Sequence, residues 1–306
     1  MLEIEIIYII APLIGFIGMM SGGYWGVGCG WVIVPTMLIF GEDTLSAVGI
    51  GLLQMIPSTV FTTVRQLPEI GWKRGSFGLS LALPICGGAL LTSLFGKKLN
   101  TMIIELAGSP RPIQWFLVVF IGLIAIQTLF SSTASYDAPL AKINGKQSLI
   151  ALITGMITGL ISSMLGVGGG ILIRPLLSSF FKLKEYFTSR ISRFLVLVTS
   201  ITGGTTYLLK SGVIDWHMLA LAGAIAAGGM FGFPLGSRIH HIVYEGGYAQ
   251  HIHKSFGSVT IAVPVSTILK MYDYALLSQI VMLTVAFALG AYLLLFAQYV
   301  KKHPLR

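Results

Sequence analysis

Apolar runs recur along the whole chain, and short stretches that carry most of its charged residues separate them. The runs lie at about 4–22, 28–40, 44–66, 76–95, 113–131, 148–165, 168–181, 194–209, 218–237, 255–269 and 276–300. An α-helix needs roughly 20 apolar residues to cross the hydrocarbon core of a bilayer, and many of these runs approach that length. The pattern predicts a polytopic all-α integral membrane protein with roughly 8–11 hydrophobic segments.

Two of the runs, 28–40 and 168–181, are short, and each follows a glycine-rich stretch. Glycine weakens a helix, and exposed backbone at membrane depth needs a protein or water-filled surrounding. Three arrangements remain open for each short run and its predecessor: a full hairpin, a broken helix or a re-entrant loop.

Composition and charge agree with a membrane protein. Of the 306 residues, 55% are apolar and 10% are charged, whereas about a quarter of a soluble domain is charged. Lys and Arg number 20 against 11 Asp and Glu, but they lie in short loops, which is a topology signal rather than a nucleic-acid surface. The acidic N-terminal stretch is expected to be a retained first helix rather than a signal peptide. Cys29 and Cys86 both lie in apolar runs, so no disulfide is expected.

The chain repeats itself, which predicts two related halves. Three landmarks recur in one order: 26–35 (GVGCGWVIVP) matches 166–175 (GVGGGILIRP) without a gap, 70–73 matches 214–217 after a four-residue slip, and 96–99 matches 236–239. We expect a first membrane repeat at 1–130, a polar linker at 131–147, a second repeat at 148–270 and an extra C-terminal helix and tail at 271–306.

Loop charges orient these halves. With the N-terminus outside, most loop cations are cytoplasmic, namely Lys73, Arg74, Lys142, Lys146, Lys182, Lys184, Arg190, Arg238, Lys254, Lys301, Lys302 and Arg306. The linker and the C-terminus are then cytoplasmic too, as the positive-inside rule requires. Each half crosses the membrane an odd number of times, so the repeats are inverted, as in many transporters. If each short run instead completes a single broken crossing, the repeats are parallel.

The two glycine clusters are the strongest candidate for a binding site. They comprise Gly26, Gly28 and Gly30 in the first half and Gly166, Gly168, Gly169 and Gly170 in the second. A helix that restarts after such a break points its N-terminal N–H groups and their partial positive charge at the cavity, which favours an anion. The alternative for any one glycine is close packing of helices.

Two arginines and four uncharged polar residues extend this candidate site. A cation inside an apolar run is costly, so Arg174 is expected to face a cavity, unless its side chain extends to the lipid headgroups. Arg193 opens a later run and reaches the same region, unless it is a cytoplasmic loop charge beside Arg190. The remaining candidates lie on repeat-equivalent helices and could instead bond neighbouring helices; they are Gln54, Ser58, Thr199 and Thr202.

Catalytic and metal-binding patterns find little support. The cluster of His240, His241, His251 and His253 matches no structural zinc spacing and is expected to be a solvated cytoplasmic loop. The chain has no Walker A motif, HExxH motif or Ser-His-Asp order. No cofactor, no metal, no nucleic-acid partner and no enzymatic activity are predicted; the expected partners are a small anion and the lipid bilayer, and a homodimer stays open.

The glycine–proline motif, its repetition and the tryptophan landmark resemble the TauE/SafE family of sulfite and organosulfonate exporters. Residues 166–175, 199–207 and 215–216 fit the family pattern closely, whereas Cys29 and Gly71 depart from it in the first half. Arg193 with Ser192 stands where the second half often has Thr-Ser. The resemblance covers about residues 10–300 and implies a sulfur-containing oxyanion as cargo.

These observations together predict a secondary transporter of the cytoplasmic membrane that moves a small oxyanion, such as sulfite or a sulfonate, by alternating access around the two glycine breaks. The alternatives are an anion channel with the same pore chemistry, a membrane-embedded metal enzyme that uses the histidine cluster, and a scaffold or receptor.

Overall fold

The computed structural model describes residues 2–70, 77–130, 143–181, 185–210 and 212–305. Within these residues, the first half of the chain forms the helices α1 (Leu2–Trp25), α2 (Gly30–Ile39), α3 (Thr44–Leu53), α4 (Met55–Ile70), α5 (Phe77–Ser93), α6 (Gly96–Ala107) and α7 (Arg111–Phe130). The second half holds α8 (Gly145–Leu165), α9 (Gly170–Phe181), α10 (Glu185–Tyr207), the short hairpin β1 (Leu209–Lys210) and β2 (Val213–Ile214), α11 (Trp216–Glu245), α12 (Ala249–Thr260), α13 (Ala262–Met271) and α14 (Ala275–Lys302). The predicted loop cations at 73–74, 142 and 182–184, and most of the predicted linker, lie outside the described residues.

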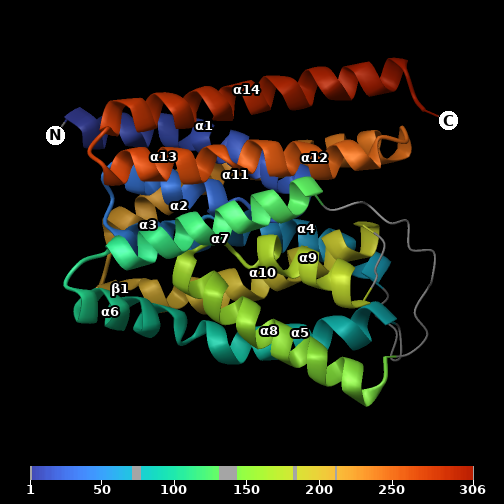
Figure 1. Cartoon of the computed structure of the whole chain (residues 1–306), viewed down its shortest axis with the longest axis horizontal. Coiled ribbons are helices and arrows are strands. Elements are labelled where there is room, and N and C mark those ends of the chain that lie inside the picture. Colours follow the sequence, from blue (N-terminus) through green and yellow to red (C-terminus); the bar gives the residue numbers. More distant parts are fainter. Residues whose placement is uncertain (1, 71–76, 131–142, 182–184, 211, 306) are drawn as a thin grey trace.

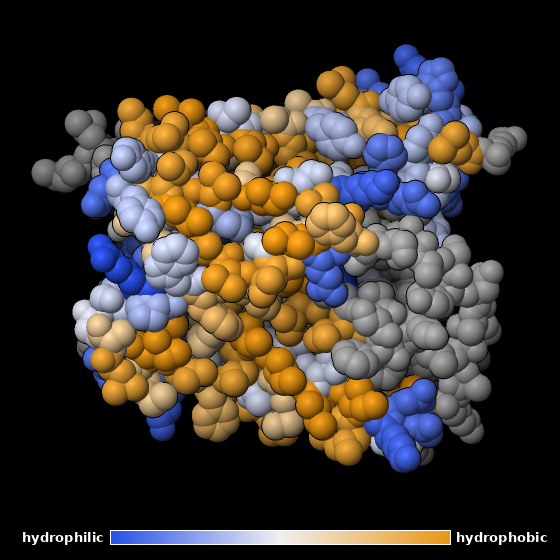
Figure 2. All heavy atoms as spheres, in the orientation of Figure 1, coloured by the Kyte–Doolittle hydropathy of each residue, from blue (hydrophilic) through white to orange (hydrophobic). Residues whose placement is uncertain are grey.

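The helices form one bundle whose axes follow its long dimension (Figure 1). Within the described residues, seven helical spans are long and apolar enough to cross a membrane, and the bent pair α5–α6 raises the number to eight. Figure 2 shows the matching surface, with hydrophobic side chains across the middle of the visible face and hydrophilic ones gathered toward its two ends. The chain is therefore a polytopic α-helical membrane protein, as its hydropathy pattern predicts.

The two short helices after the glycine clusters are too short to cross a bilayer. α2 has 10 residues and α9 has 12, which correspond to about 15–18 Å at 1.5 Å per residue, against about 30 Å of hydrocarbon. The α1–α2 pair returns to the end at which α1 began, because Tyr8 of α1 and Glu42 after α2 both hydrogen-bond His217, at 2.8 and 2.9 Å. Of the three arrangements left open, the pair is a turn-back and not a single broken crossing.

The halves exchange their first helices, so that α1 packs along α11 and α8 packs along α5. A Cβ atom at Gly228 of α11 would lie 1.7 Å from the Pro12 carbonyl oxygen, and one at Gly236 would lie 1.9 Å from that of Met20. The repeat-equivalent Gly88 of α5 approaches the Leu152 carbonyl in the same way. In both pairs small residues let parallel backbones touch, which is a common way to join helices in membranes.

The two halves run in opposite directions, which agrees with inverted repeats. In Figure 1, α1 begins beside the N-terminal label and runs toward the opposite end, whereas α8 runs back toward the end where α1 began. The turn-back of α1–α2 accounts for the inversion, because it leaves each half with an odd number of crossings.

Five features of the described helices differ from the expected ones. The third run divides at Gln54 into α3 and α4, and an amphipathic helix, α6, follows α5. α8 begins at Gly145, inside the expected linker, because Asn144 and Gln147 form a capping box there. α10 begins at Glu185 and α11 ends at Glu245, so both extend well beyond the apolar runs that predicted them. The added turns carry charged residues that hydropathy assigns to loops.

Candidate functional site

Both glycine clusters interrupt the helices, as predicted. α1 ends at Trp25 and α2 begins at Gly30, and α8 ends at Leu165 and α9 begins at Gly170. Between them the backbone takes the left-handed conformation at equivalent positions: φ is +68° at Gly26 and +75° at Gly166, and +79° at Gly28 and +78° at Gly168. Residues with a side chain rarely adopt these angles, so the clusters are required by the turn itself.

The two breaks contact each other in a reciprocal way, as a single binding site formed by both clusters requires. A Cβ atom at Gly30 would lie 2.1 Å from the Gly166 carbonyl oxygen, and one at Gly170 would lie 2.2 Å from the Val27 carbonyl oxygen. Each short helix therefore begins directly against the backbone of the other break. The contact is closed in this conformation, since even a methyl group would not fit there.

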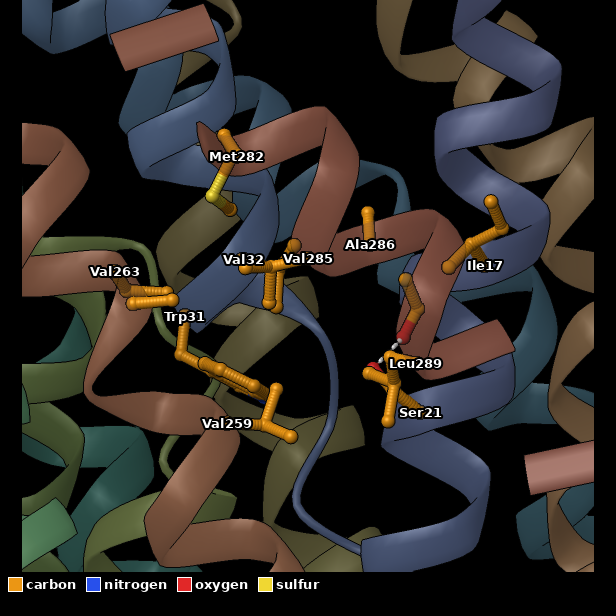
Figure 3. A pocket seen from close by; sticks show the side chains of 12 residues that line it. Ile17, Ser21, Trp31, Val32, Val259, Val263, Met282, Val285, Ala286 and Leu289 are labelled. Carbon is orange, nitrogen blue, oxygen red and sulfur yellow. Dashed lines mark hydrogen bonds between the residues drawn. The ribbon is translucent and has the colours of Figure 1, made fainter. Parts of the chain in front are cut away.

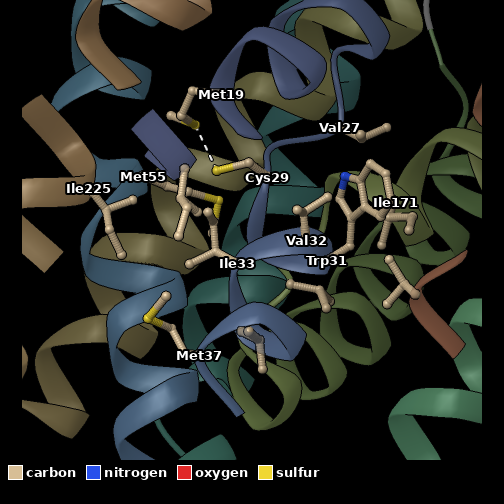
Figure 4. Packing of buried hydrophobic residues seen from close by; sticks show 14 of the residues in the cluster. Met19, Val27, Cys29, Trp31, Val32, Ile33, Met37, Met55, Ile171 and Ile225 are labelled. Atoms are coloured by element: carbon tan, nitrogen blue, oxygen red, sulfur yellow. Dashed lines mark hydrogen bonds between the residues drawn. The ribbon is translucent and has the colours of Figure 1, made fainter. Parts of the chain in front are cut away.

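A cluster of sulfur atoms and one amide fills the space beside this contact. Figure 4 shows Met55 and Cys29 near the point where α2 begins. The Met55 sulfur would lie 3.1 Å from a Cβ at Gly28 and 2.9 Å from one at Gly168, so it touches both breaks. The predicted site residue Gln54 is fully buried, and its Nε2 donates to the Cys29 sulfur at 3.0 Å.

Polar side chains of α10 donate hydrogen bonds to backbone carbonyl groups of both breaks. The Ser192 hydroxyl lies 3.0 Å from the Gly26 oxygen and 3.3 Å from the Gly170 oxygen, and can donate to either. The Thr199 hydroxyl lies 3.1 Å from the Gly168 oxygen. Thr199 was a predicted site residue, whereas Ser192 was noted only as a departure from the family pattern. The role of Ser192 was missed because this residue is buried in a helix that starts earlier than expected.

The two predicted arginines are both buried in the helix bundle. Arg174 of α9 has a relative exposure of 8%, and Arg193 of α10 has 5%. The Arg193 Nη2 donates to the Gly23 carbonyl oxygen at 3.1 Å, and its guanidinium carbon lies 5.5 Å from the centre of the Phe233 ring. Neither arginine is a headgroup or loop charge. The loop assignment of Arg190 is wrong, because the early start of α10 buries it to 8% exposure.

His240 lies beside these arginines and was not expected there. The sequence assigned it to a solvated loop, but α11 continues through it and its relative exposure is 9%. Its Nδ1 lies 2.6 Å from the Tyr24 carbonyl oxygen, and its ring interacts electrostatically with Arg193 and Arg174. By contrast His241 is exposed and pairs with Glu245 at 3.0 Å, and His251 is exposed on α12. The side chain of His253 lies outside the described residues.

Two predicted site residues bond elsewhere. The Ser58 hydroxyl donates to the Met55 carbonyl oxygen of its own helix at 3.1 Å and lies 3.9 Å from the Met19 sulfur. Thr202 bonds Ser93 of α5 and the backbone of α10. Both act as links within or between helices in this conformation, which is the alternative that the sequence left open for them.

Two pockets away from the breaks have the wrong chemistry for an anion. The first is apolar and lies between α1, α2, α14 and the α12–α13 region; Figure 3 shows Trp31, Val32, Met282 and Leu289 lining it. The second lies at the end of the bundle and is polar, but its lining includes Glu42, Asp43 and Asp215. Carboxylates repel an anion. Within the described residues, no group of three or more His, Cys, Asp or Glu side chains is placed to hold a metal.

Known proteins similar to this chain are membrane transporters. Residues 11–267 match the family model described as "Sulfite exporter TauE/SafE". The chain is 24% identical to "Probable membrane transporter protein YunE" of Bacillus subtilis over 76% of this chain and 88% of that protein. It is 27% identical to "Probable membrane transporter protein MJ0441" of Methanocaldococcus jannaschii over 68% of this chain and 75% of that protein. No solved structure matches the chain. These relatives are named as transporters and not as enzymes.

Proposed function

The chain belongs to the TauE/SafE sulfite exporter family, and we propose that it is a secondary transporter of a small sulfur-containing oxyanion such as sulfite or a sulfonate. Transport proceeds by alternating access across the cytoplasmic membrane. The N-terminus lies outside and the linker and C-terminus lie in the cytoplasm, in accordance with the distribution of loop cations.

One observation carries this proposal: the N-termini of α2 and α9 meet at the reciprocal glycine contact, and two buried arginines lie on α9 and on α10, the helix that bonds both breaks. Arg174 is on α9, four residues after Gly170, and Arg193 is on α10 directly after Ser192. A helix N-terminus favours an anion, and an arginine keeps its charge at any physiological pH and donates several hydrogen bonds to an oxyanion. The two buried guanidinium groups repel each other, and a negatively charged cargo between them would reduce this repulsion.

The closed contact between the breaks must open for an anion to pass. The close backbone contacts of α1 with α11, and of α8 with α5, are the joints that such a motion would keep. The moving bodies are then one group built around α1 and α11 and another built around α5 and α8, each with helices from both halves. Separation of these groups at the glycine breaks opens the site to one side at a time.

Ligand-induced stabilisation tests the cargo class. Purified protein is heated with sulfite, thiosulfate, methanesulfonate, acetate or phosphate, and a ligand that binds the folded state raises the melting temperature by mass action. We expect sulfite or methanesulfonate to stabilise the protein more than acetate does. Equal shifts for all five anions, or no shift, would refute a selective sulfur-oxyanion site.

Replacement of Arg174 by Met tests the site itself. Met retains much of the apolar stem and removes the charged donors, and a charge-assisted hydrogen bond contributes about 1.5–3 kcal/mol, so sulfite affinity should fall roughly ten- to a hundredfold. The matched control is Lys254→Met, which removes an exposed cation on α12 and should leave affinity unchanged. Wild-type affinity and transport in Arg174→Met would place the anion elsewhere.

A further inference from the structure

The hydroxyl group of Ser162 lies unpaired beside the second glycine break. Ser162 is in the last turn of α8 and has a relative exposure of 1%. Its Oγ would lie 3.4 Å from a Cβ atom at Gly169, the residue directly before α9. Within the described residues, this oxygen has no hydrogen-bond partner, and neither has Oγ1 of the fully buried Thr158, one turn earlier on the same face of α8. Two buried hydroxyl groups are therefore unsatisfied at the start of α9.

Ser162 departs from the usual behaviour of a serine inside a helix. Such a hydroxyl commonly donates to a carbonyl oxygen of its own helix, three or four residues earlier. The adjacent Ser163 does so, since its hydroxyl lies 2.7 Å from the Gly159 carbonyl oxygen. A buried hydroxyl that stays unpaired destabilises the folded protein. The orientation of Ser162 toward Gly169 is accounted for if a ligand accepts its hydrogen bond.

The first turn of α9 adds backbone donors at the same place. Its first intrahelical hydrogen bond runs from the Ile173 N–H to the Gly169 carbonyl oxygen at 3.0 Å, so the N–H groups of residues 170–172 have no acceptor within the helix. Gly169 has no side chain that could accept from them. These N–H groups and the two hydroxyl groups can all donate, which is what an oxyanion requires.

The equivalent place at the first break has different chemistry. With the two breaks aligned, Gly22 of α1 corresponds to Ser162 of α8 and provides no hydroxyl. Cys29 corresponds to Gly169, and its side chain packs toward α1, with its Cβ 3.8 Å from a Cβ atom placed at Gly18. A thiol is a weaker donor than a hydroxyl. On the side that faces the preceding helix, the first break therefore presents a thiol and the second presents hydroxyl groups.

We propose that the anion binds at the second break on the side that faces α8, where Ser162 and Thr158 donate hydrogen bonds to its oxygen atoms together with the first turn of α9. This inference rests on the proposed function and names residues that contact the cargo. The anion enters when the contact between the breaks opens. Ser162 contributes to binding and not to folding, because its hydroxyl is unpaired while no anion is bound.

The variant Ser162→Ala tests this role, because stability and affinity should change in opposite directions. Removal of an unpaired buried hydroxyl should raise the melting temperature of the anion-free protein by about 2–4 °C. Loss of a donor to the anion should lower the affinity for sulfite or methanesulfonate, measured calorimetrically, by at least about tenfold. The matched control is Ser163→Ala, which removes a buried hydroxyl that already bonds its own helix and should leave the affinity unchanged.

A second variant tests the hydroxyl of Thr158. Thr158→Val removes this hydroxyl and keeps the methyl group, which would lie 3.2 Å from a Cβ atom at Gly169. We expect the double variant Ser162→Ala/Thr158→Val to bind either anion more weakly than Ser162→Ala does. Equal affinity of the single and double variants would contradict the role given to Thr158.

The possible results separate this site from the proposed function. Wild-type affinity in Ser162→Ala overturns the site, while leaving the anion transporter intact. A lower melting temperature together with a lower affinity overturns it as well, because Ser162 then supports the structure rather than the anion. If wild type binds neither sulfite nor methanesulfonate, the cargo class is wrong and the site at the second break falls with it.

Discussion

Replacement of Gly170 by alanine should force the two glycine breaks apart. Gly170 is the first residue of α9 and has an ordinary helical backbone, so alanine brings no backbone strain. Its Cβ would, however, lie 2.2, 2.6 and 2.8 Å from the carbonyl oxygen, carbonyl carbon and Cα of Val27. These are backbone atoms, which cannot rotate away as a side chain can. The whole of one break must therefore move relative to the other.

The magnitude follows from two opposing terms. Alanine in place of glycine stabilises a helix by up to about 1 kcal/mol, whereas overpacking a closed interior contact costs about 1–3 kcal/mol or more. We expect the second term to dominate at Gly170, because three backbone atoms are involved. Each kcal/mol lowers the melting temperature by about 2–4 °C in a large domain. Gly87 on α5 is the matched control, because a Cβ there meets nothing within 4 Å, so Gly87→Ala should be neutral or stabilising.

Thermal unfolding in detergent and transport of sulfite into proteoliposomes are the two assays. Gly170→Ala should melt earlier than Gly87→Ala and should transport more slowly, because the closed state is destabilised. A Cβ atom at position 30 would lie 2.1 Å from the Gly166 carbonyl oxygen, so Gly30→Ala should behave like Gly170→Ala. The double variant Gly30→Ala/Gly170→Ala should lower the melting temperature by less than the sum of the two single variants, since the first substitution already separates the breaks. If Gly170→Ala melts and transports like Gly87→Ala, the closed contact is not part of the working protein.

Two further predictions concern the hydrogen bonds from Ser192 of α10 to the breaks and the orientation of the protein in the membrane. Ser192→Ala removes the hydroxyl that can donate to the Gly26 and Gly170 carbonyls. This should cost about 1–3 kcal/mol if the buried Gly26 carbonyl is left unpaired and should lower the melting temperature; an unchanged melting temperature would contradict a role of Ser192 in holding the breaks. Tyr274 and Lys302, both exposed, flank α14, so a cysteine at 274 should react with an impermeant thiol reagent in intact cells and one at 302 should react only after permeabilisation. The reverse labelling would contradict the proposed orientation.

The sequence alone determined the membrane class, the approximate positions of the apolar helices and the two breaks. Long apolar runs can satisfy their backbone groups in a bilayer only as helices, and the positions of Gly28 and Gly168 mark turns that only glycine adopts with ease. The match between 26–35 and 166–175 also predicted two related breaks. All of these follow from local chemistry, in which each residue's own properties and its near neighbours decide the outcome.

Only the tertiary structure decided which polar residues gather at the breaks. Hydropathy placed the start of α10 too late and the end of α11 too early, because it cannot distinguish a charge in a loop from a charge packed against other helices. Arg193 and His240 lie on those missed turns, and long-range contacts with Gly23 and Tyr24 of α1 bury them. The exchange of α1 and α8 between the halves could not be predicted from the sequence either, because it depends on backbone contacts between glycines and carbonyls far apart in the chain. Such contacts depend on how helices pack, which no single segment specifies.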